Sequence, residues 1–196
     1  MEACRLTATE LACCRGGRIL FRGLSLSLGS GRAAHVAGPN GTGKSSLIRI
    51  LAGLLDPFAG TVKRQGAVAL LDERPALDEH RPLARALGFW RTIDGADTLP
   101  VAELGLVDLV DVPVRYLSTG QRKRAAIARM IGQRAPIWLL DEPLNGLDAM
   151  AVLQVERLVA EHCRAGGIAV IASHQPFTLP GMGEVHIADF QPPSAE

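Results

Sequence analysis

The 196-residue sequence lacks any apolar run long enough to cross a membrane, and it carries almost no net charge. Its longest apolar stretches, such as 67–71 and 168–172, have the length of a strand, whereas a membrane-spanning helix needs about 20 apolar residues. The formal net charge of +1 gives no general electrostatic attraction to nucleic acid or to an anionic membrane surface. We therefore expect a chain that does not itself cross a bilayer, and its partners have to be inferred from its motifs.

Cysteine is scarce and irregularly placed. The spacing of Cys4, Cys13, Cys14 and Cys163 matches neither a zinc knuckle nor a disulfide framework. The first residues also lack the basic start and apolar core of a secretory signal. We expect reduced thiols, in the core or near the surface, and a cytosolic protein.

Strand and helix patterns alternate along most of the chain. The segment 6–13 is rich in β-forming residues, and 24–28 alternates leucine with serine at the two-residue period of a strand. Apolar runs that indicate buried strands occur at 33–37, 68–71, 137–140 and 168–172, and helical patterns occur at 44–54, 122–131 and 149–163. This alternation predicts an α/β fold with a largely parallel sheet.

The middle of the chain departs from this alternation. The segment 78–111 is richer in proline, glycine, aspartate and arginine, and it offers only short helical patterns at 83–90 and 101–110. We predict a single domain over residues 1–196, with a helical arm inserted at about 78–115.

Residues 38–45 read GPNGTGKS, a full match to the phosphate-loop pattern G-x-x-x-x-G-K-[ST]. The pattern lies between a predicted buried strand and a predicted helix, whereas a plain glycine-rich surface turn needs no such context. Its glycines let the backbone turn so that several amides and the positive end of the helix dipole face one point. The residues expected to bind a di- or triphosphate are Gly38, Pro39, Asn40, Gly41, Thr42, Gly43, Lys44, Ser45 and Ser46. Lys44 supplies a positive charge to the β and γ phosphates, and the Ser45 hydroxyl is offered to Mg2+.

Two acidic residues follow a predicted buried strand. Asp141 and Glu142 are placed at the carboxyl edge of the sheet, where ligands of open α/β sheets bind. Successive strand side chains point opposite ways, so we assign Asp141 to Mg2+ and Glu142 to the attacking water as general base. His174 follows the last buried strand and is predicted to reach a γ phosphate from the same edge. The competing interpretation of the two acids is a helix N-cap before Pro143.

Residues 117–121 read LSTGQ, ahead of a basic and strongly helical segment. This motif resembles the LSGGQ signature of the ABC ATPases. It occurs with the phosphate loop upstream, LLDEP at 139–143, LNGLD at 144–148 and a switch residue, His174, in the order and at the spacing of that family. The resemblance covers nearly the whole chain, which is identified as a member of the ABC ATPases.

This resemblance implies an ABC-type ATPase with a mostly parallel central sheet, an N-terminal antiparallel β part and a short helical arm. It implies ATP and Mg2+ as ligands and a head-to-tail homodimer, with each ATP between the phosphate loop of one copy and the signature of the other. Ser118, Gly120 and Gln121 are the signature residues expected at the nucleotide, since a helix N-terminus favours an anion. The basic run 122–124 would also suit nucleic acid, but this helix is basic in the family for packing and interface reasons, so we expect no nucleic acid.

Three features depart from the family pattern. Arg74 occupies the place of a glutamine that touches Mg2+ and the attacking water, so either the contact is lost or Glu73 or Asp72 replaces it. The loop before the first long strand has no aromatic residue to stack on adenine, and Arg15 is the expected substitute. Thr119 replaces the second glycine of the signature.

The short length, DEPLNGLD at 141–148 and ASHQP at 172–176 resemble the heme-exporter ATPases of bacterial cytochrome c maturation. That resemblance implies a separate transmembrane subunit, CcmB-like, together with CcmC and CcmD. It also implies a peripheral position on the cytoplasmic face of the inner membrane, where hydrolysis serves release of a heme-loaded chaperone. Two alternatives stay open: the ATPase subunit of another small ABC transporter, and a soluble ABC ATPase of DNA repair or translation.

Overall fold

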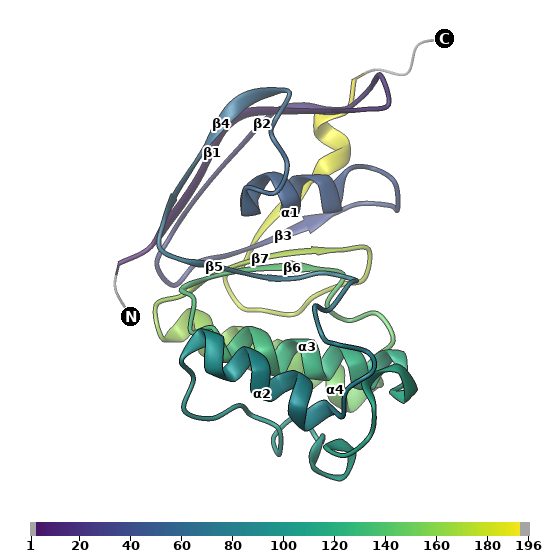
Figure 1. Ribbon diagram of the computed structural model, residues 1–196. Helices are drawn as coiled ribbons and strands as arrows, with labels where there is room; N and C mark the ends of the chain where they lie inside the picture. Colours follow the sequence, from purple (N-terminus) through teal and green to yellow (C-terminus); the bar gives the residue numbers. More distant parts are fainter. Residues whose placement is uncertain (1–2, 193–196) are drawn as a thin grey trace.

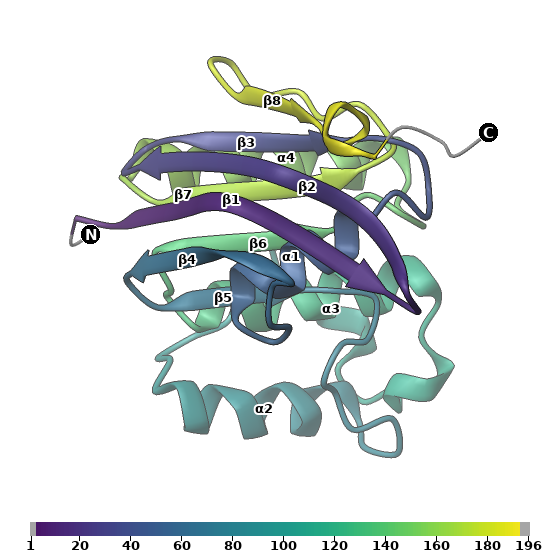
Figure 2. The same ribbon diagram turned by 90° about the horizontal axis from the view of Figure 1, so that it is seen from above.

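The computed structural model describes residues 3–192, which form two β-sheets with one helix between them and three more helices on the far side (Figure 1). The first sheet is antiparallel, in the order β2-β1-β4, with β1 at Arg5–Arg15, β2 at Arg18–Gly29 and β4 at Ala59–Gln65. The second sheet has the order β5-β6-β7-β3-β8, with β3 at Ala33–Ala37, β5 at Val68–Leu71, β6 at Ile137–Asp141, β7 at Ile168–Ser173 and β8 at Gly183–His186. The first sheet lies across the second when the molecule is seen from above (Figure 2).

All neighbouring strands of the five-stranded sheet are parallel. Every residue of β6 and β7 is buried, which explains why these strands are continuous apolar runs rather than alternating ones. Parallel strands bring their carboxyl ends to one edge, so the residues after β3, β6 and β7 meet there. The prediction of a mostly parallel sheet with an antiparallel β part is confirmed.

The helices divide between the two faces of the parallel sheet. Helix α1 is at Lys44–Ala52, α2 at Leu83–Asp94, α3 at Thr119–Gly132 and α4 at Ala149–Arg164. Helix α1 lies between the two sheets, and Leu47, Ile48, Ile50 and Leu51 are fully buried there. Helices α2, α3 and α4 lie against the opposite face (Figure 1), so the sheet separates two hydrophobic cores.

Strands β1 and β2 form a hairpin whose second strand packs against the phosphate loop. The two-residue turn Gly16–Gly17 has φ of +56° and +77°, the left-handed pair that suits the twist of a tight hairpin. Further along β2, Leu20 and Phe21 pack against Gly43, where an added Cβ would lie 3.1 Å from Phe21 Cδ1. The antiparallel sheet therefore supports the phosphate loop from one side.

Three local expectations were wrong or incomplete. The predicted helix at 101–110 is replaced by turns and a short 3-10 helix at Val107–Leu109, because Gly105 takes a φ of +62° and interrupts any helix. Strand β4 was missed because its sequence, AGTVKRQ, has no apolar run and no alternation, and almost all of its residues are exposed. Strand β8, also missed, is short and mostly exposed.

The segment between β5 and α3, where the arm is predicted, contains α2, the 3-10 helix at Val107–Leu109 and another at Val114–Tyr116. The Arg129 guanidinium of α3 lies 3.5 Å from the centroid of the Trp90 ring of α2, and the Trp90 indole donates to the Ala76 carbonyl. The first contact holds α2 on α3, and the second ties α2 to the segment after β5. The arm limits of 78–115 and the single-domain division stay predictions. Within residues 3–192 no helix has both the length and the apolarity needed to span a bilayer.

Candidate nucleotide site

The phosphate loop connects the carboxyl end of β3 to the first turn of α1. Gly41 and Gly43 have φ of +81° and +107°, and a Cβ at Gly38 would lie 2.8 Å from Ile187 Cγ2. Helix α1 begins after Gly43, and no side chain of the described residues caps it. Its first amides are therefore available to bind an anion.

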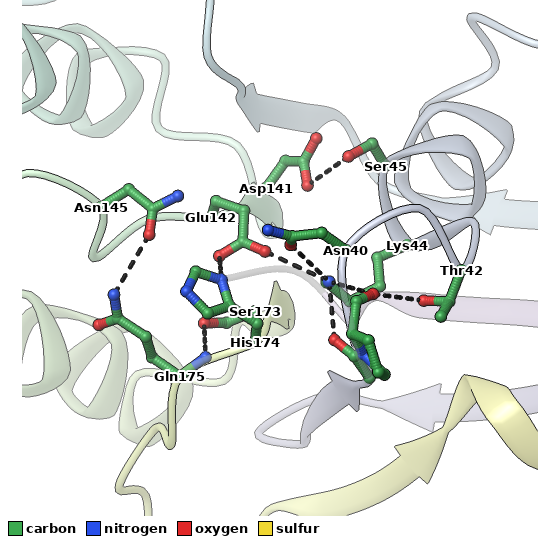
Figure 3. A network of polar contacts seen from close by, with 12 residues as sticks. Asn40, Thr42, Lys44, Ser45, Asp141, Glu142, Asn145, Ser173, His174 and Gln175 are labelled. Carbon is green, nitrogen blue, oxygen red and sulfur yellow. Dashed lines mark hydrogen bonds and ion pairs between the residues drawn. The ribbon is translucent and has the colours of Figure 1, made fainter.

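The Lys44 ammonium lies between this loop and the acidic end of β6 (Figure 3). Its Nζ donates to the carbonyl oxygens of Gly38 and Pro39 at 2.8 and 3.0 Å, and lies 3.5 Å from Asn40 Oδ1. It is also 3.4 Å from Glu142 Oε1, with both side chains buried. Across the loop, the Thr42 hydroxyl donates to the Pro39 carbonyl at 2.8 Å.

Ser45 and Asp141 present two oxygen ligands to the same point. The Ser45 hydroxyl donates to Asp141 Oδ1 at 3.0 Å. Burial raises the pKa of the Asp141 carboxyl, and the hydrogen bond from Ser45 partly opposes this. Mg2+ prefers oxygen ligands and usually takes one or two from protein, with phosphate and water completing its shell. The pair therefore fits Mg2+. Residues 3–192 contain no group of three or more His, Cys, Asp or Glu side chains that could hold a metal ion.

Contacts from α1, α3 and the end of β7 surround Glu142. Its N–H donates to the Ala172 carbonyl of β7 at 2.8 Å, and its own carbonyl accepts from Lys123 Nζ of α3 at 3.0 Å. Its Oε2 lies 2.9 Å from His174 Nδ1, and its Oε1 faces Lys44. The residue has a φ of +47°, a left-handed conformation that costs roughly 1–2 kcal/mol for a residue with a side chain. The surrounding contacts offset this cost and aim the carboxylate at the phosphate loop.

His174 and Gln175 extend this network from the end of β7. The His174 side chain is 39% exposed, so its ring remains accessible from solvent while Nδ1 faces Glu142. The Gln175 N–H donates to Ser173 Oγ at 2.9 Å, and Gln175 Nε2 donates to Asn145 Oδ1 at 3.3 Å (Figure 3). The ends of β6 and β7 are thus tied together at the site.

A cavity of about 380 Å³ opens beside the phosphate loop. The lining residues are Leu20, Asn40, Gly41, Gly43, Lys44, Ser45, Ser46, Glu73, Glu142 and Asn145. Sequence reasoning missed Leu20, which carries no motif signal, and did not assign Asn145 to the site although this residue lies in the LNGLD motif. Within residues 3–192 the predicted adenine contact, Arg15, is exposed at the tip of the hairpin and outside this lining. Ser46 hydrogen-bonds the Cys13 thiol, whose pKa is raised by burial.

The signature segment lies at the N-terminus of α3, outside the lining of the phosphate-loop cavity. Ser118 Oγ accepts from the Gln121 N–H at 3.2 Å, and Gln121 Oε1 accepts from the Ser118 N–H at 2.8 Å, which is a capping box. A Cβ at Gly120 would lie 2.5 Å from the Gly146 carbonyl, so the signature packs directly on the 144–148 loop. Among the described residues that line the phosphate-loop cavity, none belongs to 118–121.

Asp72, Glu73 and Arg74, which follow β5, have different surroundings. Asp72 Oδ1 accepts from the Arg74 N–H at 3.0 Å and so stabilises its own turn. Glu73 lines the phosphate-loop cavity and also a second cavity of about 580 Å³, between this segment and α3. Arg74 lines the second cavity, with Arg122 and Lys123.

Comparison with known proteins agrees with this geometry. The family model described as ABC transporter matches residues 21–145. The "Cytochrome c biogenesis ATP-binding export protein CcmA" of Novosphingobium aromaticivorans is 61% identical over 192 residues, covering 98% of this chain and 100% of that protein. The protein of the same name from Sphingopyxis alaskensis is 50% identical over 184 residues, covering 92% and 95%.

A solved structure supports the fold independently. A putative ABC transporter ATP-binding protein from Pyrococcus furiosus matches with a TM-score of 0.83 at 18% identity, covering 96% of this chain and 100% of that chain. The ABC fold and the family predicted from the sequence are both confirmed. The chain belongs to the ABC transporter family of ATPases, within the group of cytochrome c biogenesis ATP-binding export proteins named CcmA.

Proposed function

We propose that this chain binds and hydrolyses ATP as the ATPase subunit of a transporter complex in cytochrome c maturation. The observation that carries the proposal is the position of Glu142, a buried carboxylate held between Lys44 and His174 next to an uncapped helix N-terminus. A base placed beside a phosphate-binding loop is what attack of water on a terminal phosphate requires.

The residues divide the reaction among them. Lys44 and the loop amides bind the β and γ phosphates, and Ser45 and Asp141 hold Mg2+, which neutralises phosphate charge when bound. Glu142 accepts a proton from the attacking water. As this happens, the water oxygen bonds to the γ phosphorus, and the bond between that phosphorus and the oxygen bridging to the β phosphate breaks. His174 orients the Glu142 carboxylate through Nδ1 and offers the rest of its ring to the γ phosphate.

Glu73 is our choice for the role that a glutamine has elsewhere in the family. Asp72 is engaged by the Arg74 N–H, and Arg74 lines the other cavity, whereas Glu73 lines the phosphate-loop cavity with Ser45 and Glu142. A carboxylate oxygen can ligate Mg2+ or accept from water, which a guanidinium cannot.

In this proposal, adenine is bound by Arg15 and Leu20 of the β1–β2 hairpin. Arg15 lies exposed beside the turn, and Leu20 on the next strand lines the cavity. A guanidinium plane over the ring and an aliphatic side chain below it would replace the missing aromatic residue.

The active form is a head-to-tail homodimer in this proposal. Support comes from the separation within one chain between the phosphate-loop cavity and Ser118, Gly120 and Gln121. The Ser118 hydroxyl accepts from the cap and can still donate its own hydrogen, so the signature of one copy can bind the γ phosphate held by the other.

Mixing two inactive variants tests the composite site. Lys44→Ala removes the phosphate-loop charge and Ser118→Arg blocks the signature, so each homodimer should be nearly inactive. A heterodimer keeps one complete site, and random mixing should restore up to about a quarter of wild-type ATPase activity. Activity that stays at the level of the separate variants would contradict the dimer.

The membrane partner in this proposal is a separate transmembrane subunit of the CcmB kind, with CcmC and CcmD, which places the chain peripherally on the cytoplasmic face of the inner membrane. The name of the similar proteins, which includes "export protein", supports this assignment. Affinity purification of the tagged chain from detergent-solubilised membranes should recover cytochrome maturation membrane proteins. Recovery of the membrane subunit of a different small transporter would favour the alternative.

A further inference from the structure

Lys123 is a buried lysine that no motif accounts for. It lies in α3, two residues beyond the signature, and is only 8% exposed. A lysine is rarely buried unless a partner compensates for the lost hydration. Its ammonium donates to the backbone carbonyl of Glu142 at 3.0 Å, 19 residues further along the chain.

Acidic side chains surround this ammonium. Glu73, Asp141, Asp72 and Glu142 all favour its charged form, although burial lowers the Lys123 pKa overall. The charge therefore has electrostatic support from both the end of β6 and the segment after β5. Its hydrogen bond, however, goes to the carbonyl of Glu142.

The Glu142 peptide needs such a contact because it has a left-handed conformation, with φ of +47°. On one side, its N–H is fixed to β7 through Ala172. On the other, the carbonyl accepts from Lys123 and, at 3.4 Å, from the Asn145 N–H of the adjoining loop. With the N–H fixed, a change in the φ of Glu142 would move its carbonyl and its side chain together, and so would turn the side chain away from Lys44 and His174.

We propose that Lys123 is a positioning residue that fixes the Glu142 peptide and links the signature helix to the catalytic carboxylate of the same subunit. The inference rests on the proposed role of Glu142 as general base. Because Ser118–Gln121 begins the helix that carries Lys123, engagement of this signature by a partner copy's nucleotide moves Lys123 with it. A shift of about 1 Å is enough to break a hydrogen bond of this length.

The test compares three variants of the full chain. Lys123→Met keeps the aliphatic stem and removes the donor, Lys123→Arg restores a donor, and Lys63→Met makes the same change at an exposed position on β4. We expect Lys123→Met to lower kcat about tenfold or more, with the KM for ATP and the Kd for a fluorescent ATP analogue changed less than about twofold. Lys123→Arg should recover a clear part of kcat, and Lys63→Met should match wild type.

Several results would overturn the inference. They are an unchanged kcat in Lys123→Met, a loss of nucleotide affinity in parallel with kcat, or no recovery in Lys123→Arg. Thermal melts accompany each assay, with Lys123→Gln replacing Lys123→Met if that variant unfolds; unfolding of both would assign Lys123 to folding and not to positioning. A wild-type chain that lacks ATPase activity would instead contradict the proposed function itself.

Discussion

The hydroxyl oxygen of Ser45 lies 3.0 Å from Oδ1 of Asp141, although 96 positions separate the two residues in the chain. Ser45 lies in the first turn of α1 and Asp141 ends β6, so the contact joins the phosphate loop to the acidic edge of the sheet. Asp141 is buried there, and within residues 3–192 no cationic side chain forms an ion pair with it, which makes its ionised form costly. The cost is expected at a site that binds a divalent cation.

Replacing Asp141 by Asn should separate stability from metal binding. The amide oxygen still accepts from Ser45, and the buried charge is removed. The pKa of the Asp141 carboxyl is raised in the folded state, so the folded protein binds the carboxyl proton more tightly than the unfolded chain does. The stability of the fold therefore falls as pH rises from the ordinary carboxyl pKa through the raised one. Above that window, in EDTA, Asp141→Asn should melt at a higher temperature than wild type.

Mg2+ should not stabilise the Asp141→Asn variant. With ATP present throughout, addition of Mg2+ should raise the melting temperature of wild type but not of Asp141→Asn. Asp108→Asn, an exposed acid on the arm, is the matched control. A variant that is less stable than wild type in EDTA at neutral pH would contradict the cost assigned to Asp141.

Lys44→Ala should weaken nucleotide binding itself. The ammonium is buried and within reach of the loop, and a charge-assisted hydrogen bond is worth about 1.5–3 kcal/mol, roughly a 10- to 100-fold change in Kd. Titration with a fluorescent ATP analogue measures the change. Lys63→Ala on the exposed strand β4 should leave the affinity unaltered, and equal affinity in all three proteins would refute the assignment.

Glu142→Gln should stop turnover and leave nucleotide binding intact. Glutamine keeps the size of the side chain but accepts no proton, so kcat should fall by about 100-fold or more. With ATP bound and unhydrolysed, the variant should elute as a dimer in size-exclusion chromatography, whereas Glu103→Gln, at an exposed position, should behave as wild type. Undiminished hydrolysis would show that another group is the base.

His162 should give the protein a stability that depends on pH. Its ring stacks on Trp138 with centroids 3.8 Å apart, and Nε2 donates to the Ile168 carbonyl at 3.2 Å. Burial lowers the His162 pKa below its ordinary value of 6.5, so the unfolded chain binds the proton more readily. Stability should therefore fall as pH drops below about 6.5.

Thermal melts between about pH 5 and pH 7.5 measure this effect. In His162→Phe, which keeps an aromatic ring on Trp138, the melting temperature should change less across that range than in wild type. His186→Gln, at an exposed position, is the control and should follow the wild-type curve. A His162→Phe curve parallel to wild type would place the pH dependence elsewhere.

The sequence alone predicts a large part of the architecture and the outline of the site. Buried parallel strands are continuous apolar runs, so β3, β5, β6 and β7 were found with nearly correct limits. The phosphate loop carries its own pattern. Local rules failed where local signals are weak or misleading, as in the exposed strand β4 and in the helix expected at 101–110.

Only the tertiary structure decided how the site residues meet. Sequence spacing placed Glu142 and His174 on one sheet edge, but the left-handed backbone of Glu142 and its bond to Lys123 depend on contacts from β7 and α3. The choice of Glu73 over Asp72 likewise rests on which side chain faces the cavity. The phosphate loop and most of the strands and helices are specified by residues close together in the chain. The orientation of the Glu142 carboxylate is set by packing between distant segments, which no local pattern records.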